Sequence, residues 1–263
     1  MDKEYKTVKV EIEGPVARVN FCRPEVHNAF NDVLIYEMTD LFQSLKKEEG
    51  LRVIVLSGEG KSFCAGADLN WMRRVKDYSY EKNLEESLAL ADLFYLIYTM
   101  PLPVIGRING AAIGGGTGFV SVCDISVAAE SAKFSFSEVK IGIVPACIGP
   151  YVIRKLGEGK AREFFISGER LTAAEAYRIG LVNRYYPDDK LDEEIDKLIK
   201  TLLSSGPNAI AMAKELVSNI PGMKPHEFKP YTAKMIAKLR LSDEGQEGMD
   251  AFLNKRKPNW VKE

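Results

Sequence analysis

Two glycine-rich segments, Phe63-Cys64-Ala65-Gly66-Ala67-Asp68 and Gly114-Gly115-Gly116-Thr117-Gly118, indicate how this chain folds and where it acts. Each follows a short apolar run that is typical of a strand, and each stands where a helix is expected to begin. Small side chains let a ligand approach the backbone, and the first amides of a helix have no partner inside that helix. Two such loops facing each other would aim two N–H donors at one oxygen, which predicts an oxyanion hole.

Strands and helices alternate around these two segments. Apolar residues alternate with polar ones on both sides of Gly14-Pro15, which predicts a β-hairpin over residues 8–21. We expect a charged, mobile connection over residues 72–82. Further strands are expected at 53–56, 104–108 and 125–128, and further helices are expected after the cap Asn31-Asp32, at 84–98 and through Val122. The alternation favours an α/β layered fold.

The pattern becomes almost entirely helical from residue 188 onward. Amphipathic helices are expected at 191–203, 208–217, 231–239 and 244–254. We therefore divide the chain into a core, residues 1–190, and a helical C-terminal region, residues 191–263, that packs over the core or across a subunit interface.

Composition excludes several classes of protein. With 36 basic and 37 acidic residues the net charge is −1, so no basic field favours nucleic acid or an anionic membrane. The two histidines rule out a histidine-rich metal site, and no metal is predicted. No secretory leader and no run of about 18 apolar residues is found, so we expect no membrane span. The four cysteines form no CxxC pair, which is typical of a reduced, cytoplasmic protein.

Neither glycine-rich segment fits a nucleotide-binding fingerprint. The GxGxxG pattern fails because its last glycine would fall on Phe119 or on Ser121. Gly60-Lys61-Ser62 resembles the end of a P-loop, but Val55 stands where its first glycine is required. The basic cluster 255–257 is either a solvated helix end or an anion-binding group.

Glu138 is the candidate acid/base. It stands in Phe136-Ser137-Glu138-Val139-Lys140, between an apolar strand and the apolar stretch 141–145. Apolar surroundings would raise the pKa of its carboxyl toward neutrality, which suits proton transfer. A surface glutamate paired with Lys140 is the ordinary alternative.

Taken together, the motifs resemble those of the crotonase superfamily, the enoyl-CoA hydratase/isomerase family. The resemblance extends in order along nearly the whole chain. It rests on Arg23-Pro24 with Asn28-Ala29, 63–68, Asn109-Gly110-Ala111 leading into 114–116, Cys123-Asp124, Ser137-Glu138 with Gly142 and Pro145, 168–176, 180–182, Glu247-Gly248, Ala251-Phe252 and 255–258.

The resemblance implies a spiral of ββα units with a C-terminal helical trimerisation region, assembled as a homotrimer or a dimer of trimers. It implies an acyl-CoA thioester as substrate and no separate cofactor, because coenzyme A belongs to the substrate. The amides of Ala67 and Gly115 would form the oxyanion hole, with Glu138 as acid/base. Residues that would contact the coenzyme A portion are Arg23, Val26, Ala65, Asp68, Leu69 and Lys257.

One position departs from the family pattern. Family hydratases usually carry a first glutamate where this chain has Gly118. We favour a hydratase acting on a 2-enoyl-CoA, with a branched acyl group as one option, because 68–72 and 146–150 look similar to bacterial methylglutaconyl-CoA hydratases. The alternative is a Δ3,Δ2-enoyl-CoA isomerase that uses Glu138 alone. A non-catalytic or RNA-binding relative is the third hypothesis, and the near-neutral charge weighs against it.

Overall fold

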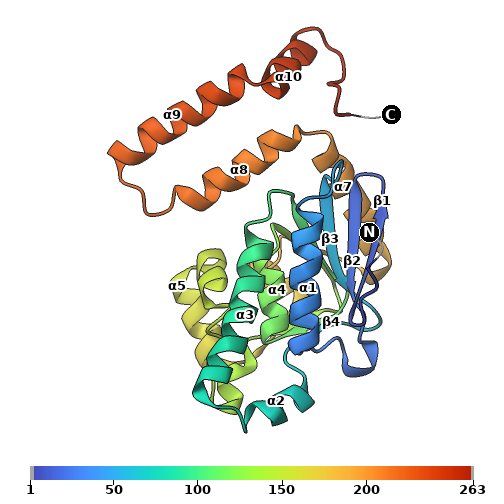
Figure 1. The fold of residues 1–263 in the computed structure, drawn as a ribbon, viewed down its shortest axis with the longest axis vertical. Coiled ribbons are helices and arrows are strands. Elements are labelled where there is room, and N and C mark those ends of the chain that lie inside the picture. The colour runs from blue at the N-terminus through green and yellow to red at the C-terminus, as the bar shows by residue number, and fades with distance from the viewer. Residues whose placement is uncertain (1–2, 262–263) are drawn as a thin grey trace.

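A computed structural model describes residues 3–261 and contains two sheets surrounded by helices (Figure 1). The large sheet has the strand order β1-β2-β3-β5-β7-β10. Its β1 and β2 pair as the antiparallel hairpin that the sequence predicts, and the remaining neighbours are parallel. The bounds are β1 Val8–Glu13, β2 Val16–Phe21, β3 Val53–Gly58, β5 Val104–Ile108, β7 Ile125–Ala129 and β10 Arg184–Tyr186.

The small sheet has the order β4-β6-β8-β9, with β4, β6 and β8 parallel and β9 antiparallel to β8. Its members are three residues long: β4 Ser62–Cys64, β6 Ala111–Ile113, β8 Lys133–Ser135 and β9 Arg170–Thr172. Each parallel strand follows one strand of the large sheet and leads into helical chain. This repeated strand–strand–helix unit confirms the predicted spiral of ββα units.

Ten α-helices are described, and several begin at caps visible in the sequence. Asn31 accepts a hydrogen bond from the amide of Leu34 at 3.0 Å and starts α1, as predicted. The α-helices are α1 Asp32–Leu45, α2 Leu69–Val75, α3 Tyr80–Tyr98, α4 Gly115–Val122, α5 Gly149–Ser167, α6 Ala173–Arg178, α7 Leu191–Leu203, α8 Pro207–Asn219, α9 Pro225–Leu241 and α10 Asp243–Leu253. Short 3-10 turns are η1 Pro24–Val26, η2 Ser137–Ile141 and η3 Asp188–Lys190.

The expected mobile connection over residues 72–82 is wrong, because α2 and the start of α3 occupy most of it. Asp68 accepts hydrogen bonds from the amides of Asn70 and Trp71, and Ser79 accepts one from the amide of Lys82. These two caps satisfy helix amides that would otherwise lack partners. The charged residues are therefore the solvent-facing sides of two helices.

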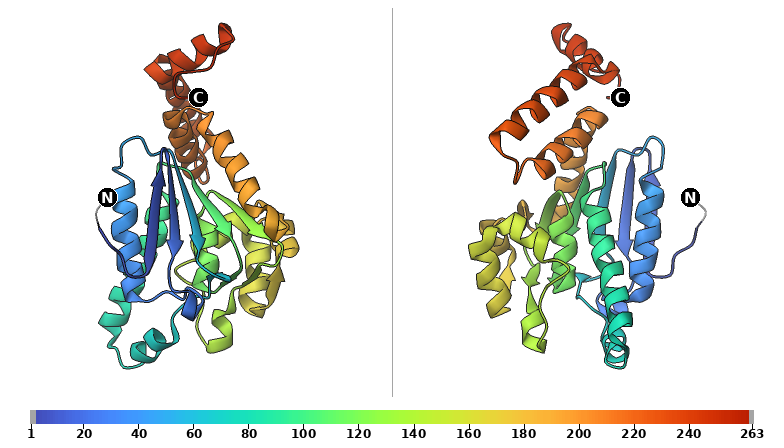
Figure 2. Two further views of the ribbon diagram at one scale, coloured as in Figure 1. Left: turned by 90° about the vertical axis from the view of Figure 1, so that its right-hand side faces the viewer. Right: turned by 60° about the vertical axis from the view of Figure 1, so that its left-hand side comes forward.

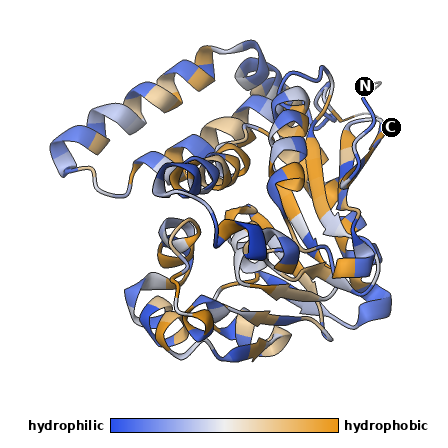
Figure 3. Cartoon of the chain, turned by 60° about the horizontal axis from the view of Figure 1, so that its bottom comes forward, coloured by the Kyte–Doolittle hydropathy of each residue, from blue (hydrophilic) through white to orange (hydrophobic). Residues whose placement is uncertain are grey.

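The main core lies between the large sheet and α1, α3 and α4. Figure 3 shows the strands of this sheet as the most continuous hydrophobic surface of the chain. Phe119 on α4 is fully buried, and its ring centroid lies 4.9 Å from those of both Phe21 and Phe94. This aromatic packing anchors α4 and so fixes the glycine-rich segment at its N-terminus.

The C-terminal helices behave in two ways. Helix α7 packs on the other face of the large sheet, where Leu191, Ile195 and Leu198 join the strand residues Val55 and Val127 in one buried cluster. Helix α8 is tied to the core by Lys214, which pairs with Asp124 at 2.6 Å, whereas α9 and α10 extend away from the sheets, as Figures 1 and 2 show. The domain boundary at 190/191 stays a prediction. No helix in the described part of the chain is long and apolar enough to cross a membrane.

Candidate active site

Three neighbouring parallel strands of the small sheet end at one edge and deliver the predicted site residues there. β4 leads into 65–68, β6 leads into Gly114, and β8 leads into the turn that carries Glu138. The carboxyl ends of parallel strands are where open α/β sheets bind ligands. The fold therefore brings both glycine-rich segments and the candidate acid/base to a single place.

The two glycine-rich segments are interlocked backbone against backbone. A Cβ placed on Gly66 would lie 2.7 Å from the carbonyl oxygen of Ile113, and one on Gly116 would overlap the carbonyl of Cys64. Gly66 also has φ of 91°, which disfavours other residues. Glycine is required at both positions so that the segments can touch.

The amides of Ala67 and Gly115 are open donors. Among residues 3–261, neither amide donates a hydrogen bond to the protein, and both residues are partly exposed. Gly115 is the first residue of α4, so its N–H lies at the positive end of the helix. Gly66 brings the two segments close, since a Cβ on it would lie 3.9 Å from the Gly115 nitrogen. Both amides are therefore available as donors, and their role in an oxyanion hole stays a prediction.

Glu138 lies beside the second segment. A Cβ on Gly114 would be 3.3 Å from Glu138 Oε1, so the carboxylate faces the glycine that precedes α4. Oε2 is buried and has no hydrogen-bond partner in the described structure. Burial raises the pKa of Glu138, and its own backbone amide offsets only part of that rise. The direction agrees with the prediction from sequence, and Lys140 is not its ion-pair partner among the described salt bridges.

Gly118 is covered by apolar side chains. A Cβ on it would lie 2.9 Å from Phe94 Cζ and 3.1 Å from Ile148 Cβ, and it would overlap Ile148 Cγ2. Phe94 and Ile148 are 0% and 2% exposed. At the position where family hydratases usually carry a first glutamate, the apolar side chains of Phe94 and Ile148 thus occupy the space for a side chain. Of the two carboxylates at these strand ends, Asp68 is paired with Arg23, and Oε2 of Glu138 has no partner in the described structure.

The predicted coenzyme A residues of the two early loops come together. Ala65 donates its amide to the carbonyl of His27 at 3.0 Å, and this joins 65–68 to the loop that holds Arg23 and Val26. Arg23 pairs with Asp68 at 2.7 Å, with 15% and 6% of their side chains exposed. Leu69, the first residue of α2, is 71% exposed next to this pair.

The Arg23–Asp68 pair acts first as a structural clamp. Burial opposes ionisation of Asp68, but hydrogen bonds from Arg23 and from the amides of Trp71 and Asn70 outweigh it, so the pKa of Asp68 lies below its usual value. Arg23 also donates to the carbonyl of Ala29. Both charges are thereby committed to holding the first glycine-rich segment against the early loop.

Lys257 is not brought to this site within one chain. It follows α10 in the sequence, and α10 lies at the opposite end of the molecule from α2 (Figure 1). In the same cluster Arg256 pairs with Glu247 and Asp250 at 2.6 Å each, which supports the solvated helix-end interpretation for that residue.

Other reactive groups do not gather here. In the described part of the chain no group of three His, Cys, Asp or Glu residues could hold a metal ion. The cysteines are free, and burial raises the pKa of Cys64 and of Cys123 to about 12. Neither thiol is therefore a nucleophile near neutral pH.

Sequence reasoning missed Phe30 and Ile148. Phe30 stands between the Asn28-Ala29 motif and the cap at Asn31, and only the folded chain places it against both glycine-rich segments. Ile148 lies in the turn 145–150, whose unusual composition was the available signal. Its contact with Gly118 joins residues thirty positions apart.

The chain is similar to enoyl-CoA hydratases over its full length. Residues 11–263 match the sequence model of the enoyl-CoA hydratase/isomerase family. A relative from Thermus thermophilus named "Putative enoyl-CoA hydratase" is 36% identical over 96% of this chain and 100% of its own length. A crystal structure of an enoyl-CoA hydratase from Shewanella pealeana superposes with a TM-score of 0.95 at 37% identity, covering 98% and 97% of the two chains. Pseudomonas aeruginosa AtuE gives a TM-score of 0.95 at 30% identity, covering 98% and 100%.

Proposed function

Because the chain belongs to the enoyl-CoA hydratase/isomerase family, we propose that it hydrates a 2-enoyl-CoA through a thioester enolate. One observation carries the proposal: the open amides of Ala67 and Gly115 and the buried carboxylate of Glu138 meet at the ends of three adjacent strands. The arrangement supplies donors for a thioester oxygen and one acid/base beside it.

A single carboxylate can complete the hydration. Glu138 takes a proton from water as the water oxygen bonds to C3, and the double-bond electrons move toward the thioester carbonyl. The enolate oxygen accepts hydrogen bonds from Ala67 and Gly115, a contribution of about 3–4 kcal/mol per donor in comparable sites. Glu138 then returns the proton to C2, so atoms and charge balance. Burial of Glu138 supports this role because it brings the pKa nearer to working pH.

Isomerisation of a 3-enoyl-CoA is the second candidate, and Gly118 favours it. With Ile148 and Phe94 packed over Gly118, there is no place for a second carboxylate to activate water. Glu138 would take a proton from C2 and return it to C4 through the same enolate. No water needs to enter for this reaction.

The coenzyme A portion is proposed to lie along the paired early loops. Arg23, Val26, Ala65, Asp68 and Leu69 border this surface, with Arg23 and Asp68 holding its shape. A branched acyl group is proposed from the resemblance of 68–72 and 146–150 to methylglutaconyl-CoA hydratases. A straight-chain preference in matched kcat/KM measurements would contradict that choice.

A homotrimer or dimer of trimers is proposed because α8–α10 present apolar side chains that the described chain does not cover. Val217, Leu241, Phe252 and Leu253 are 72–82% exposed on these helices. In such an assembly Lys257 would serve the coenzyme A portion in a neighbouring copy. The free cysteines support a reducing compartment, and we propose the cytoplasm.

One assay separates the two reactions. The protein is incubated with a 2-enoyl-CoA and, separately, with the isomeric 3-enoyl-CoA, and products are identified by mass. Formation of 3-hydroxyacyl-CoA from the 2-enoyl compound supports hydration. Conversion of the 3-enoyl compound to the 2-enoyl compound, with no hydroxy product from either, would assign the isomerase. Glu138→Gln is the control, because it keeps the shape of the side chain and removes the base.

A further inference from the structure

We propose that Phe30 is a positioning residue for the oxyanion hole, holding one donor through its backbone and the other through its ring. The inference rests on the proposed function, since it takes the amides of Ala67 and Gly115 as the donors. Phe30 is 3% exposed and would act through these amides without touching the substrate.

The backbone of Phe30 fixes the first donor. Its amide donates to the carbonyl of Gly66 at 2.8 Å, and its carbonyl accepts from the amide of Asp68 at 2.8 Å. These two bonds form an isolated parallel bridge between Phe30 and Ala67. Since the residues on both sides of Ala67 are held, the Ala67 peptide has a fixed orientation with its N–H left unpaired.

The ring of Phe30 fixes the second donor. A Cβ on Gly115 would lie 2.5 Å from Phe30 Cε1 and 2.6 Å from Cζ, so the ring edge packs on the Gly115 backbone. The ring is held in turn by Trp71, at 5.8 Å between centroids, and by Phe119, at 6.1 Å. Trp71 is itself anchored by a hydrogen bond from Nε1 to Glu86 at 2.8 Å.

One side chain thus couples two loops that have to act together. An oxyanion hole works only when both donors point at the position of the developing charge, and a displacement of about 1 Å can lower the rate by roughly 10²-fold. Removing the ring leaves the Phe30 backbone bonds in place but frees the Gly115 peptide. The expected result is weaker enolate stabilisation with the coenzyme A contacts retained.

The test compares Phe30→Ala and Phe30→Leu with Phe42→Ala. Phe42 is fully buried on α1 and lies outside the site, so Phe42→Ala removes a core ring without affecting the site. We expect Phe30→Ala to lower kcat roughly 10- to 100-fold with KM near wild type, and Phe30→Leu to recover most of the rate. Phe42→Ala should lower stability while leaving kcat per folded molecule unchanged.

A binding spectrum provides a readout that stability does not move. A 2-enoyl-CoA bound in a working oxyanion hole absorbs at longer wavelength because its carbonyl is polarised, and Phe30→Ala should reduce that shift. If the wild type turns over substrate and folded Phe30→Ala shows the same spectral shift and the same kcat, the role of Phe30 is overturned while the proposed reaction stands. A shift that depends on Phe30 without any wild-type turnover would overturn the proposed reaction and leave this role standing. If Phe30→Ala does not fold, Phe30→Val decides, because its shorter side chain also withdraws the contact with Gly115: a spectrum and kcat identical to wild type would count against the inference.

Discussion

Substitution of Gly118 by alanine tests the apolar cover over the second glycine-rich segment. The added methyl would overlap Ile148 Cγ2 and lie 2.9 Å from Phe94 Cζ, and both side chains are buried. Overpacking of this kind costs about 1–3 kcal/mol, while replacing glycine by alanine inside a helix returns about 1 kcal/mol. We expect Gly118→Ala to lower the free energy of unfolding by up to about 2 kcal/mol, or Tm by up to roughly 8 °C.

The assay is urea unfolding of a double-mutant cycle. Ile148→Ala alone should cost about 2–5 kcal/mol through the cavity that it leaves. Adding Gly118→Ala to it should then cost less than in the wild-type background, because the methyl fills part of that cavity. Gly159→Ala is the control, since nothing lies within 4 Å of a Cβ there and the change should stabilise α5. Strictly additive effects of Gly118→Ala and Ile148→Ala would refute the contact between Gly118 and Ile148.

Three further predictions concern charge and assembly. Because burial raises the pKa of Glu138 in the folded state, wild-type stability falls as pH rises through that pKa. In measurements of Tm against pH, Glu138→Gln should therefore have the higher Tm near pH 7. The difference in Tm between the two proteins should vanish below the unfolded glutamate pKa of about 4.3. Asp68 has a lowered pKa, so its stabilisation is present above the unfolded aspartate pKa of about 3.9 and is lost as pH falls through the folded pKa. Asp68→Asn leaves the largely buried Arg23 without its partner and should cost about 3–5 kcal/mol at pH 7 by urea unfolding; an equal loss at pH 7 and pH 3 would argue against the ion pair. Phe252→Glu should reduce the mass measured by light scattering toward that of one chain, whereas Tyr36→Glu on α1 should leave the mass unchanged. Identical masses for both variants would show that α10 is not part of the interface.

The sequence predicted best those elements whose signals are local. The hairpin 8–21 shows alternation interrupted by Gly14-Pro15, and α1 begins at Asp32 after the cap Asn31, so no distant contact is needed to define either. The bounds of α7 agree with the predicted 191–203 because its apolar residues recur with the helical period over the whole range. For α9 the predicted start at Tyr231 is too late, because the helix begins at Pro225 and continues through Pro230.

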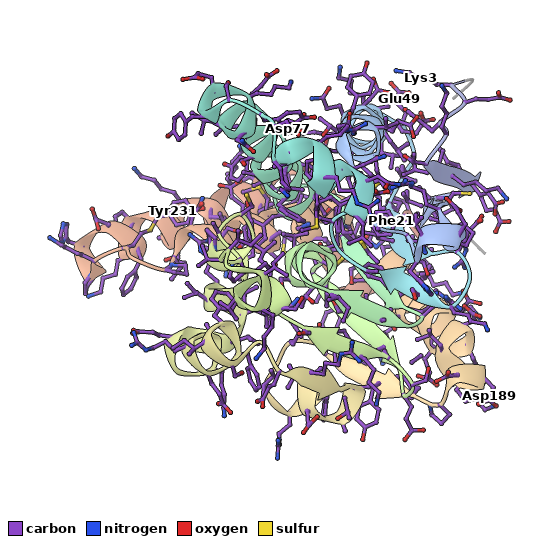
Figure 4. The ribbon with its side chains drawn as sticks, turned by 90° about the horizontal axis from the view of Figure 1, so that it is seen from below. Lys3, Phe21, Glu49, Asp77, Asp189 and Tyr231 are labelled. Atoms are coloured by element: carbon purple, nitrogen blue, oxygen red, sulfur yellow. The ribbon has the colours of Figure 1, made fainter. Side chains whose placement is uncertain are left out.

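The small sheet escaped prediction because strands of three residues carry no readable period. β4 overlaps the start of the first glycine-rich segment and β6 ends just before the second, whereas the sequence pattern indicates, directly ahead of these segments, strands only in the longer runs 53–56 and 104–108. The candidate site was nevertheless predicted in outline, since Ala67, Gly115 and Glu138 stand in quoted motifs. Figure 4 shows why the remainder needed the fold: side chains around Phe21 pack in the interior from many segments, while Tyr231 on α9 lies outside that packing.

The central claim is that Ala67, Gly115 and Glu138 form one enolate-generating site, and deuterium exchange at C2 of a bound acyl-CoA tests it most directly. The protein is incubated with 3-hydroxyacyl-CoA in D₂O, and label at C2 is followed by mass and by NMR. We predict exchange in the wild type and its near-complete loss in Glu138→Gln, with binding of the acyl-CoA retained. Equal exchange in both proteins, or binding by the wild type without any exchange, would contradict the claim.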